Sequence, residues 1–125
     1  MCSSDLHVAA LADRLAGTVG AIEEAFRTVA PGAAVCLSAS ASLGTLRVTV
    51  SDAGVAETVA VTTRLRALVA EVGGSVVIAR GPAELRRAVD AWGSVEPRAF
   101  ALMRALRDEF DPARVLNPGR YVGGL

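Results

Sequence analysis

A stretch of six residues with alternating polar and apolar side chains gives the first firm condition on how this chain folds. In Thr45-Leu46-Arg47-Val48-Thr49-Val50 every second side chain is apolar, so the apolar residues fall on one face of a β-strand. Residues 34–40 before it are short, apolar and interleaved with serine, and Ser42-Leu43-Gly44 supplies a turn. We therefore predict an antiparallel hairpin that buries one face against another layer.

Helical patterns lie on both sides of this hairpin. Before it, apolar residues recur at spacings of three and four, which predicts a helix from about Leu6 to Ala30 with Asp5 as its N-cap. After it, the same spacing predicts a helix from Val55 to Val72, ended by Gly73-Gly74. The β-branched run Val76-Val77-Ile78 then predicts a buried strand.

The second half of the chain reads as helical. Gly81-Pro82 opens a short helix predicted to run through Ala91. Another helix begins at Pro97 and ends at Asp111-Pro112, because the residue before a proline disfavours the helical conformation.

These elements predict an α+β fold. A small antiparallel sheet of three or four strands carries helices on one face and is followed by a C-terminal helical extension. We expect a single domain overall, with residues 1–80 as its core and residues 81–125 as the extension and tail. An edge left open by a missing strand would invite pairing with a second copy as a homodimer.

Composition excludes several classes of partner and site. Thirteen basic and thirteen acidic residues cancel, so no net charge attracts nucleic acid or an anionic membrane. No apolar run is long enough to span a bilayer, and the start has no signal-peptide pattern. Cys2 and Cys36 lack paired spacing and are expected to be free thiols in a reducing cytoplasm.

The end of the chain carries its most specific pattern. Phe110-Asp111-Pro112 stops the last helix, and Leu116-Asn117-Pro118-Gly119-Arg120 follows one turn later. Together with the segment from Arg80-Gly81-Pro82 to Trp92-Gly93, this order resembles the C-terminal region of FAD-linked oxidases of the vanillyl-alcohol-oxidase type. The resemblance is strongest to the small FAD-binding subunit of bacterial glycolate oxidase. It covers roughly residues 75 to 120, and the earlier part is compatible with a partial ferredoxin-like cap domain.

The resemblance implies a function. The parent enzyme would oxidise a 2-hydroxy acid such as glycolate with FAD, and this chain would be its substrate-cap domain. The family's flavin domain precedes this region and carries a Gly-rich loop, whereas Gly17, Gly20, Gly44 and Gly54 are scattered here. We therefore expect a fragment of a larger flavoenzyme that is inactive and binds no FAD alone. Its partners would be the upstream FAD-binding domain, other oxidase subunits and a small-molecule substrate.

Two tail residues are the candidate cofactor-binding residues in an intact parent enzyme. The resemblance implies that Asn117 approaches the flavin ring, although Asn-Pro-Gly is also a common turn sequence. Arg120 could pair with a substrate carboxylate or a flavin phosphate, or be a solvated surface residue. No catalytic or metal-binding residue is predicted, because a lone histidine, His7, cannot supply a multi-histidine site. Ser38, Ser40 and Ser42 lack a nucleophile motif and predict a solvated strand face.

A second class of function fits the same predicted fold. An independent small-molecule-sensing or dimerisation module could use a ferredoxin-like scaffold, because a fold does not determine a function. The residues encoded upstream of Met1 would separate the two hypotheses.

Overall fold

The computed structural model describes residues 3–125 and divides the chain into two compact units. The first ends at Ala91, and the second is Trp92–Leu125. No helix among the described residues is long and apolar enough to cross a membrane.

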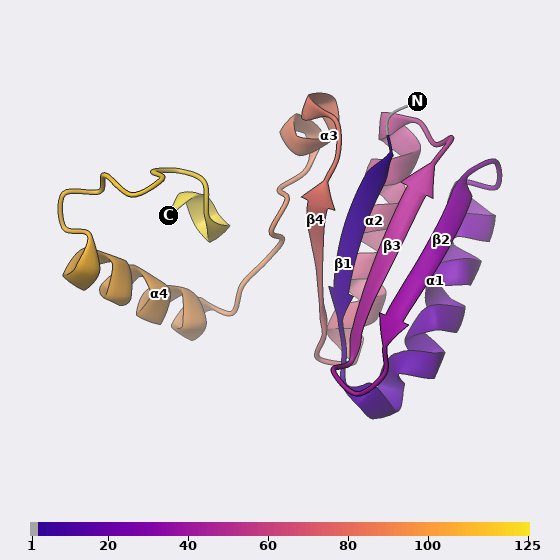
Figure 1. Ribbon diagram of the computed structural model, residues 1–125, viewed down its shortest axis with the longest axis horizontal. Helices are drawn as coiled ribbons and strands as arrows, with labels where there is room; N and C mark the ends of the chain where they lie inside the picture. Colours follow the sequence, from indigo (N-terminus) through magenta and orange to yellow (C-terminus); the bar gives the residue numbers. More distant parts are fainter. Residues whose placement is uncertain (1–2) are drawn as a thin grey trace. The chain divides into compact units, whose positions relative to one another are not determined.

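The first unit is an open four-stranded antiparallel sheet with two long helices on one face (Figure 1). The strand order is β2-β3-β1-β4, so β3 and β1 lie inside the sheet and β2 and β4 form its edges. This βαββαβ arrangement is the ferredoxin-like topology. Its elements are β1 (Ser4–Ala9), a 3-10 turn (Ala12–Arg14), α1 (Leu15–Val29), β2 (Ala34–Ser40), β3 (Thr45–Ser51), α2 (Val55–Glu71), β4 (Ser75–Arg80) and α3 (Ala83–Ala88).

The prediction of one helix from Leu6 to Ala30 is wrong in its first part. Residues 4–9 form β1, which pairs with β3 on one side and β4 on the other. Leu6 and Val8 are 0% and 1% exposed on the buried face, while Leu11, which lies within the predicted helix, is 63% exposed. Pairing on both sides outweighs the local helical pattern, because it satisfies the backbone groups of β1 within the sheet.

This strand also corrects two dependent predictions. The sheet has its full complement of four strands, so the cap is a complete rather than a partial ferredoxin-like unit. Asp5 is not a helix cap but a residue of β1, and its Oδ2 lies 3.1 Å from Nε of Arg80.

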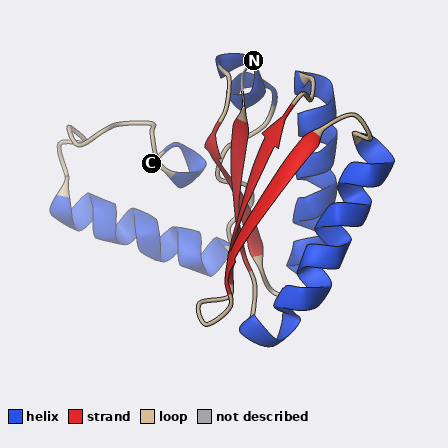
Figure 2. Ribbon diagram, turned by 45° about the vertical axis from the view of Figure 1, so that its right-hand side comes forward, coloured by secondary structure: helices blue, strands red, loops and turns tan. Residues whose placement is uncertain are grey.

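The core lies between the sheet and the two long helices (Figure 2). Leu6, Val48 and Val50 from the sheet meet side chains from α1 and α2, including Ile22, Phe26, Val61 and Leu65. Buried threonines in the helices return their hydroxyls to the backbone four residues earlier; Thr62 Oγ1, for example, donates to the Thr58 carbonyl at 2.7 Å. These buried hydroxyl groups therefore do not incur the free-energy cost of an unpaired polar group in the apolar layer.

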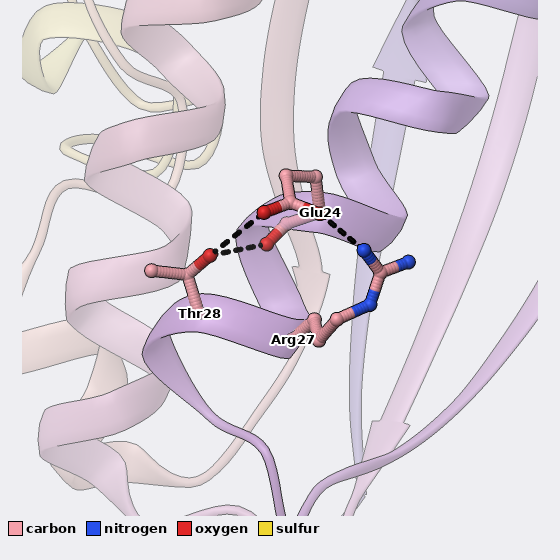
Figure 3. A network of polar contacts seen from close by, with 3 residues as sticks. All are labelled: Glu24, Arg27 and Thr28. Atoms are coloured by element: carbon pink, nitrogen blue, oxygen red, sulfur yellow. Dashed lines mark hydrogen bonds and ion pairs between the residues drawn. The ribbon is translucent and has the colours of Figure 1, made fainter.

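The outer surface of α1 carries an ordinary exposed polar network. Figure 3 shows Glu24 between Arg27, three residues on, and Thr28, four residues on. Thr28 Oγ1 also donates to the Glu24 carbonyl at 2.8 Å. Contacts of this spacing support a solvated helix face and add little stability.

The predicted hairpin is confirmed as β2 and β3, and α2 and β4 are confirmed near their predicted bounds. The short helix after Gly81-Pro82 ends at Ala88 rather than Ala91. Gly44 in the hairpin turn has φ +63°, and a Cβ there would collide with the Ala10 carbonyl. This close approach explains why the turn uses glycine.

The two edges of the sheet are formed by β4 and β2. The alternating strand β3 lies inside the sheet, between β2 and β1. β4 is an edge strand, and the chain after α3 returns along it, with Ile78 N donating to the Ala91 carbonyl at 2.8 Å. Arg66 secures the same segment, since its guanidinium donates to the carbonyls of Asp90 at 2.6 Å and Ala91 at 3.1 Å. β2 forms the other edge.

The second unit consists of α4 (Pro97–Phe110) and a tail that ends in a 3-10 turn (Val122–Gly124). The Glu96 side chain accepts a hydrogen bond from Ala99 N at 2.8 Å, and Pro97 occupies the first helical position. Both predicted ends of this helix are confirmed. α4 buries none of its residues, although its sequence carries apolar side chains at helical spacing.

Candidate functional site

Asp111 organises the tail that carries the candidate residues. α4 ends at Phe110, and the Asp111 carboxylate then accepts hydrogen bonds from the backbone N–H groups of Val115 and Leu116, both at 3.0 Å. These bonds hold the pKa of Asp111 below its ordinary value, and the bond from Leu116 has the larger effect. Asp111 is buried. Its two hydrogen bonds join the end of the helix to the next turn and so close a loop.

Asn117 and Arg120 are the first and last residues of the following turn. Arg120 N donates to the Asn117 carbonyl at 3.2 Å, which closes the turn around Pro118-Gly119. Asn117 has φ +45° and Gly119 has φ +75°. Asparagine and glycine are the residues that adopt this left-handed conformation most readily. The Asn-Pro-Gly sequence therefore has a conformational role in addition to any role of the Asn117 amide.

The structure brings both candidate residues to one hollow. A cavity of about 780 Å³ lies between α4 and the tail, and Asn117 and Arg120 line it together with Met103, Leu106, Phe110 and Tyr121. Its wall is mostly apolar, while Asn117, Arg107 and Arg120 supply donors. Among residues 3–125, the Asn117 side chain makes no hydrogen bond, so its amide is available to a ligand or another protein surface.

Two contacts hold the end of the tail in place. The rings of Trp92 and Tyr121 meet edge to face with centroids 5.0 Å apart, and Trp92 Nε1 donates to the Arg120 carbonyl at 3.4 Å. Gly123 has φ +63° and lies against the Phe100 ring, where a Cβ would collide with it. These contacts position Arg120 and Tyr121 beside the hollow.

Sequence reasoning missed one other grouping. His7, considered above only as a lone histidine, lies on β1 directly opposite Arg47 of β3. Ser38 of β2 lies opposite Arg47 on its other side. Ser38 and Ser40 do lie on this exposed strand face, opposite the helices, whereas Ser42 falls in the turn. The alternating pattern around Arg47 predicts only that its side chain points outward, so no signal in the sequence marks it as part of a site.

The remaining candidates for chemistry give no site. Cys36 is a free, exposed thiol, and Cys2 lies outside the described residues. No group of three or more His, Cys, Asp or Glu side chains within residues 3–125 could hold a metal ion. The Trp92 ring packs edge to face on Tyr121.

A dinucleotide pyrophosphate commonly binds at a Gly-rich strand-to-helix turn, and no such turn in residues 3–125 is rich in glycine. Such a group needs free backbone N–H groups at a helix start. At the start of α2, the Glu57 carboxylate already accepts the Gly54 N–H at 2.9 Å and places negative charge there. Pro82 before α3 has no N–H. Asp13 lies in the 3-10 turn before α1, and the first turn of α1 itself contains no acidic residue.

Comparison with known proteins agrees with the tail pattern. The family model described as "FAD linked oxidases, C-terminal domain" matches residues 6–121. The match covers both compact units. No curated protein is significantly similar to the chain in sequence.

Proposed function

This chain belongs to the family of C-terminal domains of FAD-linked oxidases, and from that premise we propose that it is the substrate-cap domain of a 2-hydroxy-acid oxidase. The parent enzyme would be of the vanillyl-alcohol-oxidase type. It would act on a glycolate-like substrate, as the resemblance of this chain to the small flavin subunit of bacterial glycolate oxidase implies. FAD, held by a separate FAD-binding domain, would accept the hydride. The chain by itself would be non-catalytic.

The unburied apolar face of α4 is the observation that carries this proposal. Leu102, Leu106 and Phe110 are 62%, 50% and 79% exposed, and Leu116 in the tail is 68% exposed. A contiguous apolar surface of this kind is typical of an interface. In the proposed enzyme, the FAD-binding domain covers this surface and the adjoining hollow of the tail.

The two tail residues would then have separate roles. The Asn117 amide would offer hydrogen bonds to the flavin ring, and the turn conformation already directs the backbone at that position. Arg120, at the other end of the turn, would pair with a substrate carboxylate or a flavin phosphate through its planar guanidinium. Asp111 would act only through the loop that it closes, as a positioning residue.

The test is to read the coding sequence upstream of Met1 and to produce the whole protein with and without residues 3–125. Both forms should bind FAD, because the pyrophosphate cradle lies elsewhere. Anaerobic addition of glycolate or lactate should bleach the flavin only in the whole protein, and acetate, which has no hydroxyl to oxidise, should bleach neither. Bleaching by glycolate that survives removal of this chain would show that it does not form the substrate side. An upstream region without a flavin domain would favour an independent sensing or dimerisation module.

A further inference from the structure

The sheet has a second face, on the side away from α1 and α2. The roles proposed for the tail residues do not involve this face. Side chains alternate along each strand, so one set of strand residues faces the core and the other faces outward. On the outward face the cross-strand register aligns Ser38 of β2, Arg47 of β3, His7 of β1 and Val77 of β4 in a single row. Directly opposed residues on a sheet have Cβ atoms only about 5 Å apart.

A hollow of about 410 Å³ surrounds this row. Its lining combines Arg47 and His7 with small side chains that leave room above the sheet, namely Ala9, Ser38, Ser40, Thr45 and Ser75. A larger residue at any of these positions would fill the space above the guanidinium. The hollow therefore results from the serine and alanine content of β1, β2 and β4.

The charges in this hollow have one sign. No Asp or Glu belongs to its lining, and four hydroxyl groups and an imidazole supply hydrogen-bond donors beside the guanidinium. Within residues 3–125, Arg47 forms no ion pair or hydrogen bond. The nearest acidic residue along β1, Asp5, is already engaged by Arg80, with 3.1 Å between Oδ2 and Nε.

We propose that this hollow binds the carboxylate of a small 2-hydroxy acid, with Arg47 as the anchoring cation and His7 beside it. The inference rests on the proposed function, since it assigns the substrate's acid group to the outward face of the cap sheet. It places the recognition of the substrate's charge on rigid paired strands, which leaves the flavin phosphate as the partner of Arg120 in the tail.

The chemistry of the hollow favours this ligand over other small molecules. A guanidinium matches a carboxylate through two parallel N–H···O bonds, which an amide or alcohol cannot accept with full charge. The neighbouring hydroxyls and the His7 ring can then meet the ligand's 2-hydroxyl group, which acts as both donor and acceptor. Small apolar contacts with Ala9 and Val77 suit a short carbon chain.

The direct test is an NMR titration of the 125-residue chain with glycolate at constant ionic strength. We expect saturable shifts confined to the outward face of β1, β2 and β3, including the His7 ring and the Arg47 Nε–H signal. Glycolamide has the same size and hydroxyl but no charge, and it should give no saturable shift. Equal responses to glycolate and glycolamide, or shifts spread over all exposed arginines, would overturn the proposal.

A matched pair of variants identifies the residue responsible. Arg47→Gln should weaken glycolate binding by roughly tenfold or more, because it removes a hydrogen-bonded charge pair. Arg64→Gln removes the same charge from α2, on the opposite side of the unit, and should leave binding unchanged. Both substituted side chains are exposed, so both variants should melt at the wild-type temperature. Identical binding by the two variants would contradict an anchor at Arg47.

The same substitution in the whole enzyme separates this inference from the proposed function. If both hold, Arg47→Gln raises KM for glycolate with unchanged FAD content. Oxidation of 2-hydroxy acids with an unchanged KM would refute the Arg47 site and leave the proposed function standing. Specific glycolate binding by the chain, combined with a parent enzyme that oxidises no 2-hydroxy acid, would refute the proposed function and leave a carboxylate site.

Discussion

The Asp111 carboxylate accepts a hydrogen bond from Leu116 N at 3.0 Å, five residues along the chain. Asp111 also accepts a second hydrogen bond, from Val115 N. The Asp-Pro pair therefore ends the helix, and the Asp111 side chain closes the loop that precedes Asn117. The position of the candidate cofactor-binding turn therefore depends on Asp111, which also lines the hollow.

Replacing Asp111 with asparagine should loosen this loop. Asparagine keeps the size of the side chain but has a single acceptor oxygen, so one of the two backbone N–H groups loses its partner. We expect hydrogen exchange at Val115 or Leu116 to accelerate by roughly tenfold, as for a lost bond to a charged group. Asp108→Asn is the control, because its partner Arg114 is exposed and that ion pair should matter little. Equal effects of the two changes would argue against the loop-closing role.

The same loop should depend on pH at the acid end. Hydrogen bonds from Leu116 and Val115 lower the pKa of folded Asp111, so the ionised form stabilises the fold. This stabilisation is present above the ordinary aspartate value of about 3.9 and is lost as the pH falls through the lower, folded value. The Leu116 amide signal should report a titration midpoint below about 3.9, and Asp111→Asn should abolish it. A midpoint above the ordinary value would contradict the assigned hydrogen bonds.

Gly123→Ala should destabilise the second unit. The added Cβ would collide with the Phe100 ring, and φ is +63°. We expect a loss of about 1–2 kcal/mol from the left-handed backbone and about 1–3 kcal/mol more from overpacking. Gly119→Ala is matched, since φ is +75° but nothing lies within 4 Å, and it should show the backbone cost alone. The fluorescence of Trp92 during urea unfolding measures both, and equal losses would mean that Phe100 yields freely.

Asn117 can be tested without confusing its turn with its amide. Asn117→Gly removes the amide and keeps the left-handed conformation, whereas Asn117→Ala removes the amide and also strains the backbone. In the whole enzyme, we expect both to slow flavin reduction by roughly tenfold to a hundredfold, as for the loss of a charge-assisted hydrogen bond. In the isolated chain, only the alanine variant should melt at a lower temperature. Normal flavin reduction in Asn117→Gly would make Asn117 a turn residue only.

The isolated chain should bind no FAD. The Glu57 carboxylate accepts the Gly54 N–H at the start of α2, and Pro82 before α3 has no N–H. No strand-to-helix turn in residues 3–125 is rich in glycine. After incubation with FAD and desalting, the protein should show no flavin absorbance. Stoichiometric yellow protein would contradict this prediction.

Several features could be predicted from local sequence because their causes are local. The alternation in Thr45–Val50 fixes which face of β3 is buried, and Pro97 and Asp111-Pro112 set the ends of α4 through backbone sterics. The order of Asp-Pro and Asn-Pro-Gly after that helix pointed to the family that the match over residues 6–121 establishes. Whether Asn117 and Arg120 touch a cofactor remains a prediction, because the partner surface belongs to another domain.

Tertiary structure decided the features that depend on partners distant in the chain. Residues 4–9 contain only two apolar core positions, Leu6 and Val8, too few to distinguish a strand from the first turn of a helix. They form a central strand because β3 and β4 pair with both of their edges. That pairing completes the sheet and sets His7 opposite Arg47, forty residues away. Sequence determined which side chains point outward on β3, and only the register of the assembled sheet determined which of them share a surface.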